Sequence, residues 1–130
     1  MGIKYDITTR EDIENLIRLF YEKLLSDDSL NYIFIDVAKI ELEPHISLIS
    51  DFWDNLIFGS DTYKNNAMRP HFELNDKTPL MKKHFDSWLT HFNKSVDELF
   101  EGEKAHFAKN RAQSIATVMQ VKILKPASLI

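Results

Sequence analysis

The chain has 130 residues, of which 44% are hydrophobic and 12% aromatic, and 16 Lys and Arg against 20 Asp and Glu give a formal net charge of -4. This length predicts one domain over residues 1–130, and the supply of large apolar side chains argues against disorder. Scattered charges of both signs give no support for nucleic acid or a membrane as a partner. The absence of cysteine excludes disulfides, thiolate metal sites and cysteine nucleophiles.

The N-terminal segment is polar, and no apolar run approaches the ~20 residues that span a bilayer, so we expect a cytoplasmic protein. A first helix is expected over residues 11–25, because Thr8 and Thr9 followed by Glu11 and Asp12 predict a reciprocally capped start. Its apolar positions recur at helical spacing: Ile13, Leu16, Ile17, Phe20 and Leu24. Tyr21 borders this stripe, and its hydroxyl group needs a partner.

Residues 32–35 are interpreted as a buried corner or a short helix with Phe34 facing inward, since no second alternating run exists to pair with a strand. Pro44 is expected at the first position of the next helix, which ends at Gly59. Its inward face carries His45, Ile49, Phe52, Trp53 and Leu56. A polar surface loop over residues 60–67 follows. Pro70 then favours a short helical turn that directs His71.

A further helix is expected to start with Thr78 as its cap and Pro79 at its first position. Its apolar face carries Leu80, His84, Phe85, Trp88, Leu89 and Phe92. Ser95 with Glu98 is interpreted as a second capping box, before a short apolar turn at Leu99 and Phe100. After Gly102 the last helix runs to Pro126 and carries Phe107, Arg111, Ala112, Ile115, Ala116, Met119 and Ile123. The sequence therefore predicts an all-α protein.

Four motifs occur in one order: Asp-Phe-Trp at 51–53, Gly-Ser-Asp-Thr-Tyr at 59–63, Met-Arg-Pro-His at 68–71 and His-Phe-Asp-Ser-Trp-Leu at 84–89. In this order the chain resembles the truncated haemoglobins, specifically group III, over nearly its whole length. The resemblance implies a truncated globin fold in which helices pack two on two around haem b, iron protoporphyrin IX. It also implies that His71 is the proximal ligand of the iron.

The same resemblance implies a role for each of several other side chains. His45 is expected to be the distal histidine, Tyr21 and Trp88 to lie over the bound ligand, and Phe20 to join the apolar walls. The cofactor is expected to contact Phe34, His45, Ile49, Trp53, Tyr63, Met68, Arg69, Phe72 and Trp88. Helical spacing cannot separate a pocket wall from an ordinary core, but a Tyr, a His and a Trp facing one empty cavity would be costly.

Two details concern the loop before His71. Lys64 and Arg69 are candidates to neutralise the haem propionates. Asn65 stands where the family commonly has glycine, and because Asn tolerates positive φ the turn is expected to survive.

Elsewhere, His84 and His91 share a helix face without a third ligand in register, so no zinc site is expected. His84 and His106 are interpreted as surface residues.

No phosphate loop, nucleophile elbow or His-Glu-x-x-His motif supports hydrolase chemistry. The resemblance implies binding of dioxygen, carbon monoxide and nitric oxide, for oxygen or nitric oxide chemistry rather than bulk transport, with a reductase as partner. Whether such chemistry makes the protein an enzyme stays open at this point. The alternatives are a gas sensor or a haem-free interaction module on the globin scaffold, and a helical structural domain without a cofactor.

Overall fold

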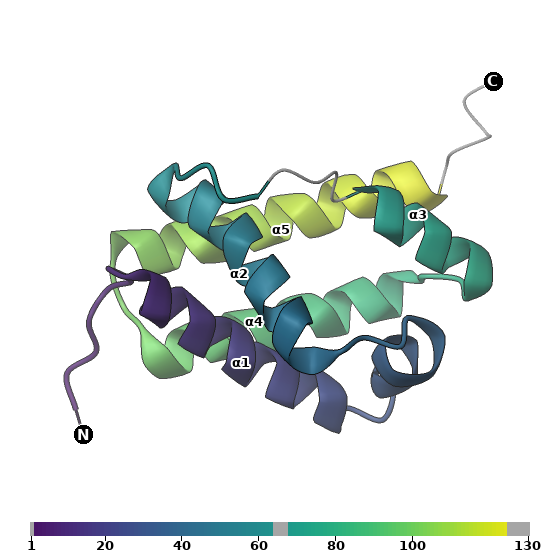
Figure 1. Ribbon diagram of the computed structural model, residues 1–130, viewed down its shortest axis with the longest axis horizontal. Helices are drawn as coiled ribbons and strands as arrows, with labels where there is room; N and C mark the ends of the chain where they lie inside the picture. The colour runs from purple at the N-terminus through teal and green to yellow at the C-terminus, as the bar shows by residue number, and fades with distance from the viewer. Residues whose placement is uncertain (1, 64–67, 125–130) are drawn as a thin grey trace.

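The computed structural model describes residues 2–63 and 68–124, and it is helical throughout, as the sequence predicts (Figure 1). The described elements are α1 (Arg10–Ser26), the π-helical turn η1 (Ile33–Val37), α2 (Leu42–Phe58), α3 (Met68–Lys77), α4 (Lys82–Leu99) and α5 (Glu103–Leu124). None of these helices is both long and apolar enough to cross a membrane.

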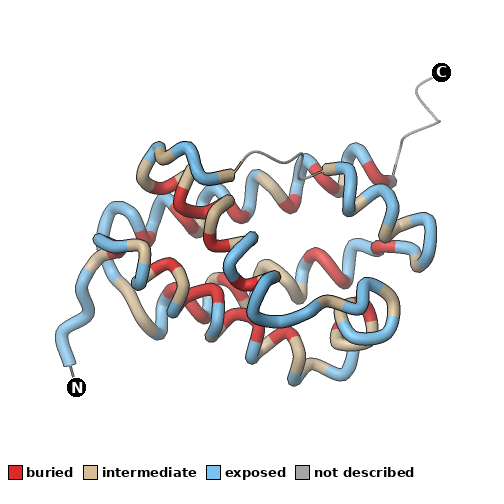
Figure 2. The backbone as a smooth tube through the Cα atoms, viewed as in Figure 1, coloured by how far each residue is buried: buried red, intermediate tan, exposed pale blue. Residues whose placement is uncertain are grey.

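Two helix pairs form the body of the protein. Helix α1 packs on α2, α4 packs on α5, and contacts of α1 with α4 and of α2 with α5 join the pairs. Figure 2 shows the buried positions on the facing sides of these helices. This arrangement confirms the predicted two-on-two packing.

The start of α1 is capped as predicted. The Thr9 hydroxyl group accepts a hydrogen bond from the Asp12 amide at 3.0 Å, and the Asp12 carboxylate accepts one from the Thr9 amide at 3.1 Å. Such a reciprocal cap stabilises a helix by about 1 kcal/mol. The predicted apolar stripe is fully buried, together with Tyr21 at 5% exposure.

Helix α2 begins at Leu42 rather than at Pro44, so the proline lies inside the first turn, where its missing N–H is still harmless. Gly59 ends the helix in a left-handed conformation with φ of 69°, as predicted. The most buried face is also rotated from the predicted one. It carries Ile46, Ser50, Trp53, Asp54 and Ile57, while the other predicted inward residues of α2 are half-buried.

The corner before α2 is the π-helical turn, in which the Ala38 amide donates to the Ile33 carbonyl oxygen at 2.8 Å. Phe34 faces inward as predicted, half-buried with its ring centroid 5.7 Å from that of Tyr21, and the neighbouring Ile33 is buried more deeply, at 3% exposure. The extra residue of a π-turn shifts the register of its side chains by one position relative to an α-helix.

Helix α4 differs from its prediction at both ends. It starts at Lys82 rather than Pro79, because the Met81 amide donates to Nδ1 of His84 at 3.0 Å and so replaces the expected threonine cap. It also continues through Ser95, whose hydroxyl group donates to the His91 carbonyl oxygen one turn earlier at 2.8 Å. A serine bonded in this way does not cap a new helix, so the second capping box is wrong.

Helix α5 is anchored at its N-terminus by Asp6, which accepts hydrogen bonds from the Lys104 and Ala105 amides at 2.9 Å each. Although burial opposes it, these amide bonds lower the pKa of Asp6. Gly102 has φ of 145° and lies so near that an added Cβ would approach Asp6 Cγ within 2.5 Å. A side chain at this position is therefore excluded.

The inner face of α5 is built from small residues, Ala105, Ala108, Ala112 and Ala116, followed by Met119 and Ile123. Phe107 lies off this face and is 40% exposed, and the Arg111 guanidinium group lies 5.9 Å from its ring centroid. The small alanines allow α4 to approach α5 closely along the buried stripe. Pro126, the predicted helix stop, lies outside the described residues.

Candidate cofactor cavity

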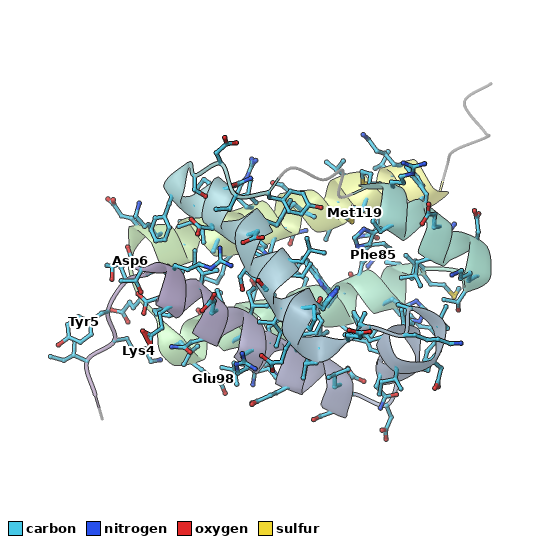
Figure 3. The ribbon with its side chains drawn as sticks, in the orientation of Figure 1. Lys4, Tyr5, Asp6, Phe85, Glu98 and Met119 are labelled. Carbon is cyan, nitrogen blue, oxygen red and sulfur yellow. The ribbon has the colours of Figure 1, made fainter. Side chains whose placement is uncertain are left out.

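A cavity of about 390 Å³ is lined by residues of α1, η1, α2, α3, α4 and α5. Its walls are mainly aromatic and aliphatic. Phe85 of α4 and Met119 of α5 lie together next to α3 in Figure 3, and both line this space. A cavity of this size and apolar character is typical of a small-molecule or cofactor site.

Most of the residues expected around a cofactor line this one cavity. They come from α1, η1, α2, the following loop, α3 and α4: Phe20, Tyr21, Phe34, His45, Ile49, Trp53, Tyr63, His71 and Trp88. The predicted polar trio of Tyr21, His45 and Trp88 is therefore gathered in one place.

Three expected contacts lie elsewhere. Met68 is half-buried against the core, Arg69 is exposed and forms an ion pair with Glu73 at 3.7 Å, and Phe72 is 39% exposed on α3. None of the three lines the cavity in the described structure. The reason is that α3 runs as one helix from Met68, so consecutive residues point in different directions. The α3 residues that line the cavity are Pro70, His71, Glu73, Leu74 and Lys77. Lys64 and Asn65 lie outside the described residues.

Tyr21 and His45 form a pair on the α1 and α2 side of the cavity. The Tyr21 hydroxyl oxygen lies 2.7 Å from Nε2 of His45, with ring centroids 5.0 Å apart and the rings 72° to each other. Burial raises the pKa of Tyr21, and burial together with the nearby His71 lowers the pKa of His45. Both groups are therefore neutral near pH 7 and share a hydrogen bond between uncharged partners.

His71 lines the cavity from α3, and it lies close enough to His45 to affect the pKa of that residue. The two imidazoles therefore approach the same space from different helices. An imidazole nitrogen in an apolar cavity is a good ligand for a haem iron.

His84 was predicted on the surface, and that prediction is wrong. It is 8% exposed, lines the cavity, and accepts the Met81 amide at Nδ1, while its Nε2 lies 3.4 Å from the Tyr32 hydroxyl oxygen. Burial, followed by the charge of Lys83, lowers its pKa. Because Nδ1 is an acceptor, the neutral ring carries its proton on Nε2. Its place among the apolar residues of α4 was the signal that could have found it.

The other two histidines lie away from the cavity. His106 is exposed, as predicted. His91 pairs with Asp27 at 2.7 Å, and this bond, with help from Ser29, lowers the pKa of Asp27 to about 2.

Trp53, Phe92 and Trp88 form a stack along the inner wall. The centroids of Trp53 and Phe92 are 4.7 Å apart at 21°, and those of Phe92 and Trp88 are 6.0 Å apart at 12°. Phe20 meets Phe92 edge to face at 5.2 Å. Interlocked rings of this kind make a rigid apolar wall, which suits a flat, largely apolar ring system.

The family of the chain follows from a comparison with known proteins. Residues 5–123 match the model of the bacterial-like globins. This chain belongs to that family. Haem binding is the property expected of the family, and the lining residues fit it, because rigid apolar walls and imidazoles from three helices face one cavity.

Individual relatives agree with this assignment. The globin is 29% identical over 126 residues to the group 3 truncated hemoglobin ctb of Campylobacter jejuni, a match that covers 95% of this chain and 97% of the relative. A crystal structure of group III truncated hemoglobin from Campylobacter jejuni superposes with a TM-score of 0.83 at 27% identity, covering 93% of this chain and 95% of that one. The predicted resemblance to group III truncated haemoglobins is confirmed.

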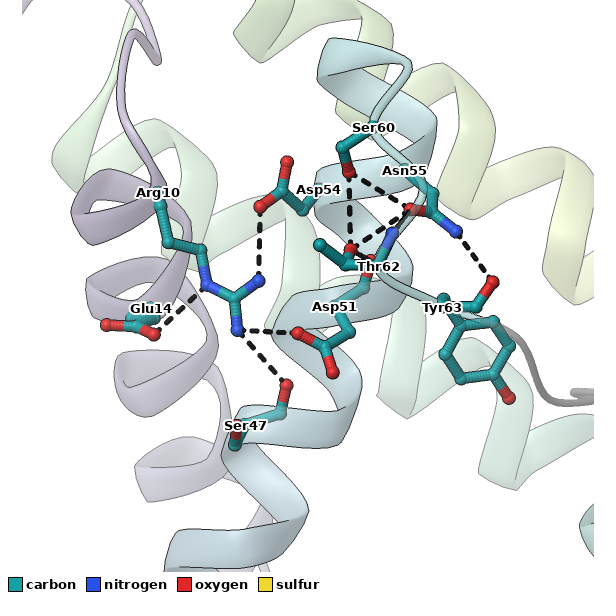
Figure 4. A network of polar contacts seen from close by, with 9 residues as sticks. All are labelled: Arg10, Glu14, Ser47, Asp51, Asp54, Asn55, Ser60, Thr62 and Tyr63. Atoms are coloured by element: carbon teal, nitrogen blue, oxygen red, sulfur yellow. Dashed lines mark hydrogen bonds and ion pairs between the residues drawn. The ribbon is translucent and has the colours of Figure 1, made fainter.

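A polar network that the sequence analysis missed lies on the outer side of α2 (Figure 4). Arg10 of α1 forms ion pairs with Asp51 at 2.8 Å and Asp54 at 3.1 Å, and Asn55 binds the loop that leads toward α3. Arg10 lies far in the sequence from Asp51 and Asp54, so local patterns do not indicate these ion pairs.

Proposed function

We propose that this globin binds haem b through His71 and holds a diatomic gas on the side of the cavity formed by Tyr21, His45 and Trp88. The observation that carries the proposal is the Tyr21 and His45 pair in a cavity whose walls are otherwise mainly apolar. Polar groups are costly in such surroundings unless they bond to each other or to a ligand. A small polar ligand would use them.

The choice of His71 as the iron ligand rests on its place in the Met-Arg-Pro-His motif, in which the chain resembles group III truncated haemoglobins, and on its position in the cavity wall. The pairing of Nε2 of His45 with Tyr21 suits a role of His45 on the gas side of the cavity.

When bound, the haem supplies an iron with a coordination position for dioxygen, carbon monoxide or nitric oxide. The protein supplies the surroundings of that position. Tyr21 and Trp88 each carry one donor on an aromatic body, and their rings are held by Phe20 and Phe92. A hydrogen bond to a ligand with partial negative charge is worth about 1.5–3 kcal/mol in such a site.

Strong polar retention of the gas favours chemistry over delivery. A protein that releases dioxygen slowly is a poor carrier but keeps the gas in place for reaction with nitric oxide or for peroxide reduction. Such a cycle needs an electron donor, so a reductase is part of the proposal.

The absorption spectrum of the purified protein, with and without carbon monoxide, tests the proposal. A haem protein gives a strong Soret band that shifts when carbon monoxide is added to the reduced form. A protein purified from haem-sufficient cells that shows no such band, and gains none on titration with haemin, would contradict the proposal and favour a haem-free interaction module.

A further inference from the structure

A short segment between α1 and α2 forms part of the cavity wall. This corner segment, residues 27–37, includes η1, and Figure 1 shows it as a compact coil between the two helices. Leu30, Ile33 and Phe34 of the segment line the cavity. The main helix contacts of the described structure join α1 to α5 with one another and do not involve η1. The place of the corner segment therefore depends on individual side chains.

Backbone hydrogen bonds make the corner segment one connected unit. The Asp27 carbonyl oxygen accepts the Leu30 amide, and the Leu30 carbonyl oxygen accepts the Ile33 amide, both at 3.0 Å. The Ile33 carbonyl oxygen then accepts the Ala38 amide at 2.8 Å. Consecutive hydrogen-bonded turns of this kind fix the backbone between their ends. A displacement of Asp27 would therefore move the residues that line the cavity.

Two histidines of α4 bind the corner segment. Nε2 of His91 lies 2.7 Å from Oδ2 of Asp27, and Nε2 of His84 lies 3.4 Å from the Tyr32 hydroxyl oxygen. The bond from His91 is the main cause that lowers the pKa of Asp27 to about 2, so the carboxylate is ionised and Nε2 of His91 is the donor. Trp88 stands between the two histidines at helical spacing, so all three residues lie on one face of α4.

The corner segment also reaches Tyr21. The Phe34 ring meets the Tyr21 ring edge to face, with centroids 5.7 Å apart and the rings 76° to each other. Aromatic pairs have a preferred geometry, so the place of Phe34 affects the orientation of the Tyr21 ring. That orientation decides where the hydroxyl group of Tyr21 stands in the cavity.

We propose that His91 is a positioning residue for Tyr21. Its bond to Asp27 fixes the corner segment against α4, and the corner segment holds Phe34 against the Tyr21 ring. In the described structure His91 does not line the cavity, so it acts through the corner segment rather than by touching a ligand. The inference rests on the proposed function for the role of Tyr21 in retaining a gas.

A second ion pair between α1 and α4 provides a matched control. Lys23 and Glu98 lie 2.9 Å apart, and the Lys23 and His91 side chains are both 22% exposed. Lys23 lies within α1, before the corner segment begins. His91→Leu removes the bond to Asp27, His91→Gln keeps a side-chain N–H, and Lys23→Met breaks the control pair.

Amide hydrogen exchange of the haem-free protein tests whether His91 holds the corner segment. Relative to the amides of α1, those of Leu30, Ile33 and Ala38 should exchange about fivefold faster in His91→Leu, the factor expected for one lost hydrogen bond. His91→Gln should restore part of the protection, and Lys23→Met should leave the ratio unchanged. No selective change in His91→Leu, or an equal change in Lys23→Met, would overturn the inference.

Dioxygen release from the haem-loaded protein tests the action through Tyr21. His91→Leu should release dioxygen about three- to fivefold faster, with little change in carbon monoxide release, and Lys23→Met should not. The effect of His91→Leu should vanish in combination with Tyr21→Phe, because the group that it positions is then absent. An undiminished effect in that combination, or no effect of His91→Leu alone, would overturn the inference.

Failure of the proposed function gives a different result. A protein that binds no haem, or in which Tyr21→Phe alone leaves dioxygen release unchanged, would contradict the proposed function. The exchange measurement needs no haem, so it would then still decide whether His91 holds the corner segment.

Discussion

The Tyr21 hydroxyl oxygen and Nε2 of His45 lie 2.7 Å apart, and a single hydrogen atom joins them. If that hydrogen belongs to Tyr21, the phenol has no donor left for a ligand. If it belongs to His45, the phenol accepts it and can point its own hydrogen into the cavity. The tautomer or position of His45 therefore decides whether Tyr21 can hold a gas.

The first prediction is that His45 gates the cavity. Opening the gate breaks the bond to Tyr21, so His45→Leu should speed carbon monoxide association by about five- to tenfold, the equivalent of ~1 kcal/mol. Release should change far less. Flash photolysis gives the association rates, and Tyr21→Phe is the control, since it removes the same bond from the other side. A low-spin, six-coordinate ferrous spectrum that His45→Leu abolishes would instead make His45 an iron ligand.

The second prediction concerns acid stability of the haem-free protein. The pKa of His45 in the folded protein is lowered from the 6.5 of the unfolded chain. Between the folded and the unfolded pKa, the unfolded chain therefore binds more protons than the folded one. Stability therefore falls as the pH falls through this window. The pKa of His84 is also lowered, but His45→Leu leaves His84 in place, so its contribution is the same in both proteins. The free energy of unfolding should thus drop less from about pH 8 to about pH 5 in His45→Leu than in the unmutated protein. Equal drops in urea titrations would count against a buried, neutral His45.

The third prediction compares two arginines. Arg10 pairs with Asp51, Asp54 and Glu14, and the Asp54 side chain is only 12% exposed. Arg10→Met leaves that carboxylate without its cation, so unfolding should become easier by about 1–3 kcal/mol. Arg18 pairs with Glu43 in the solvent, so Arg18→Met should cost clearly less stability than Arg10→Met. Similar losses for the two variants would show that the α1 and α2 crossing does not need the Arg10 network.

The Arg10 network also marks the limit of sequence-based prediction for this fold. Helix content followed from apolar spacing, and the caps at Thr9 and Gly59 were identified correctly because their partners lie within one turn. The helix starts predicted from Pro44, Pro79 and Ser95 were wrong. Proline and serine are common at helix starts, but both are also tolerated at neighbouring positions.

The cavity, too, has features that the sequence predicted and features that it did not. Its aromatic and histidine residues were gathered from the family resemblance, but His84 was interpreted as a surface residue although it stands among apolar positions, because a helical pattern does not say which flank of a helix meets a cavity. The Tyr21 to His45 distance depends on how α1 crosses α2, and the Asn55 bonds depend on how the loop after α2 turns back onto that helix. Neither relationship follows from the spacing of residues along one helix.

The fourth prediction tests the iron ligand. His71→Ala should abolish stable haem incorporation, because the remaining wall contacts are mostly apolar and do not direct the iron. His45→Ala should retain haem, since its nitrogen is engaged by Tyr21. Haemin titration of both haem-free variants, followed at the Soret band, measures the affinities. Retention of haem with an unchanged spectrum in His71→Ala, together with loss in His45→Ala, would reverse the proximal and distal sides.

The last prediction is that Tyr21 and Trp88 together retain dioxygen. Tyr21→Phe removes the hydroxyl group and leaves the ring packed on Phe20 and Phe34. Losing a hydrogen bond of about 1.5–3 kcal/mol should speed dioxygen release by roughly 10 to 150-fold. Trp88→Phe should act in the same direction but more weakly, with its stack on Phe92 kept by the smaller ring.

Carbon monoxide is the internal control, since its outer atom carries little negative charge and its release should change far less in both variants. Because the two donors share one ligand, the double mutant should depart from the sum of the single effects. Stopped-flow displacement of dioxygen on all four proteins gives the rates. If neither single variant releases dioxygen more than about threefold faster, each donor stabilises bound dioxygen by less than ~1 kcal/mol relative to phenylalanine. Polar retention of the gas would then be wrong, and oxygen chemistry would lose its main support.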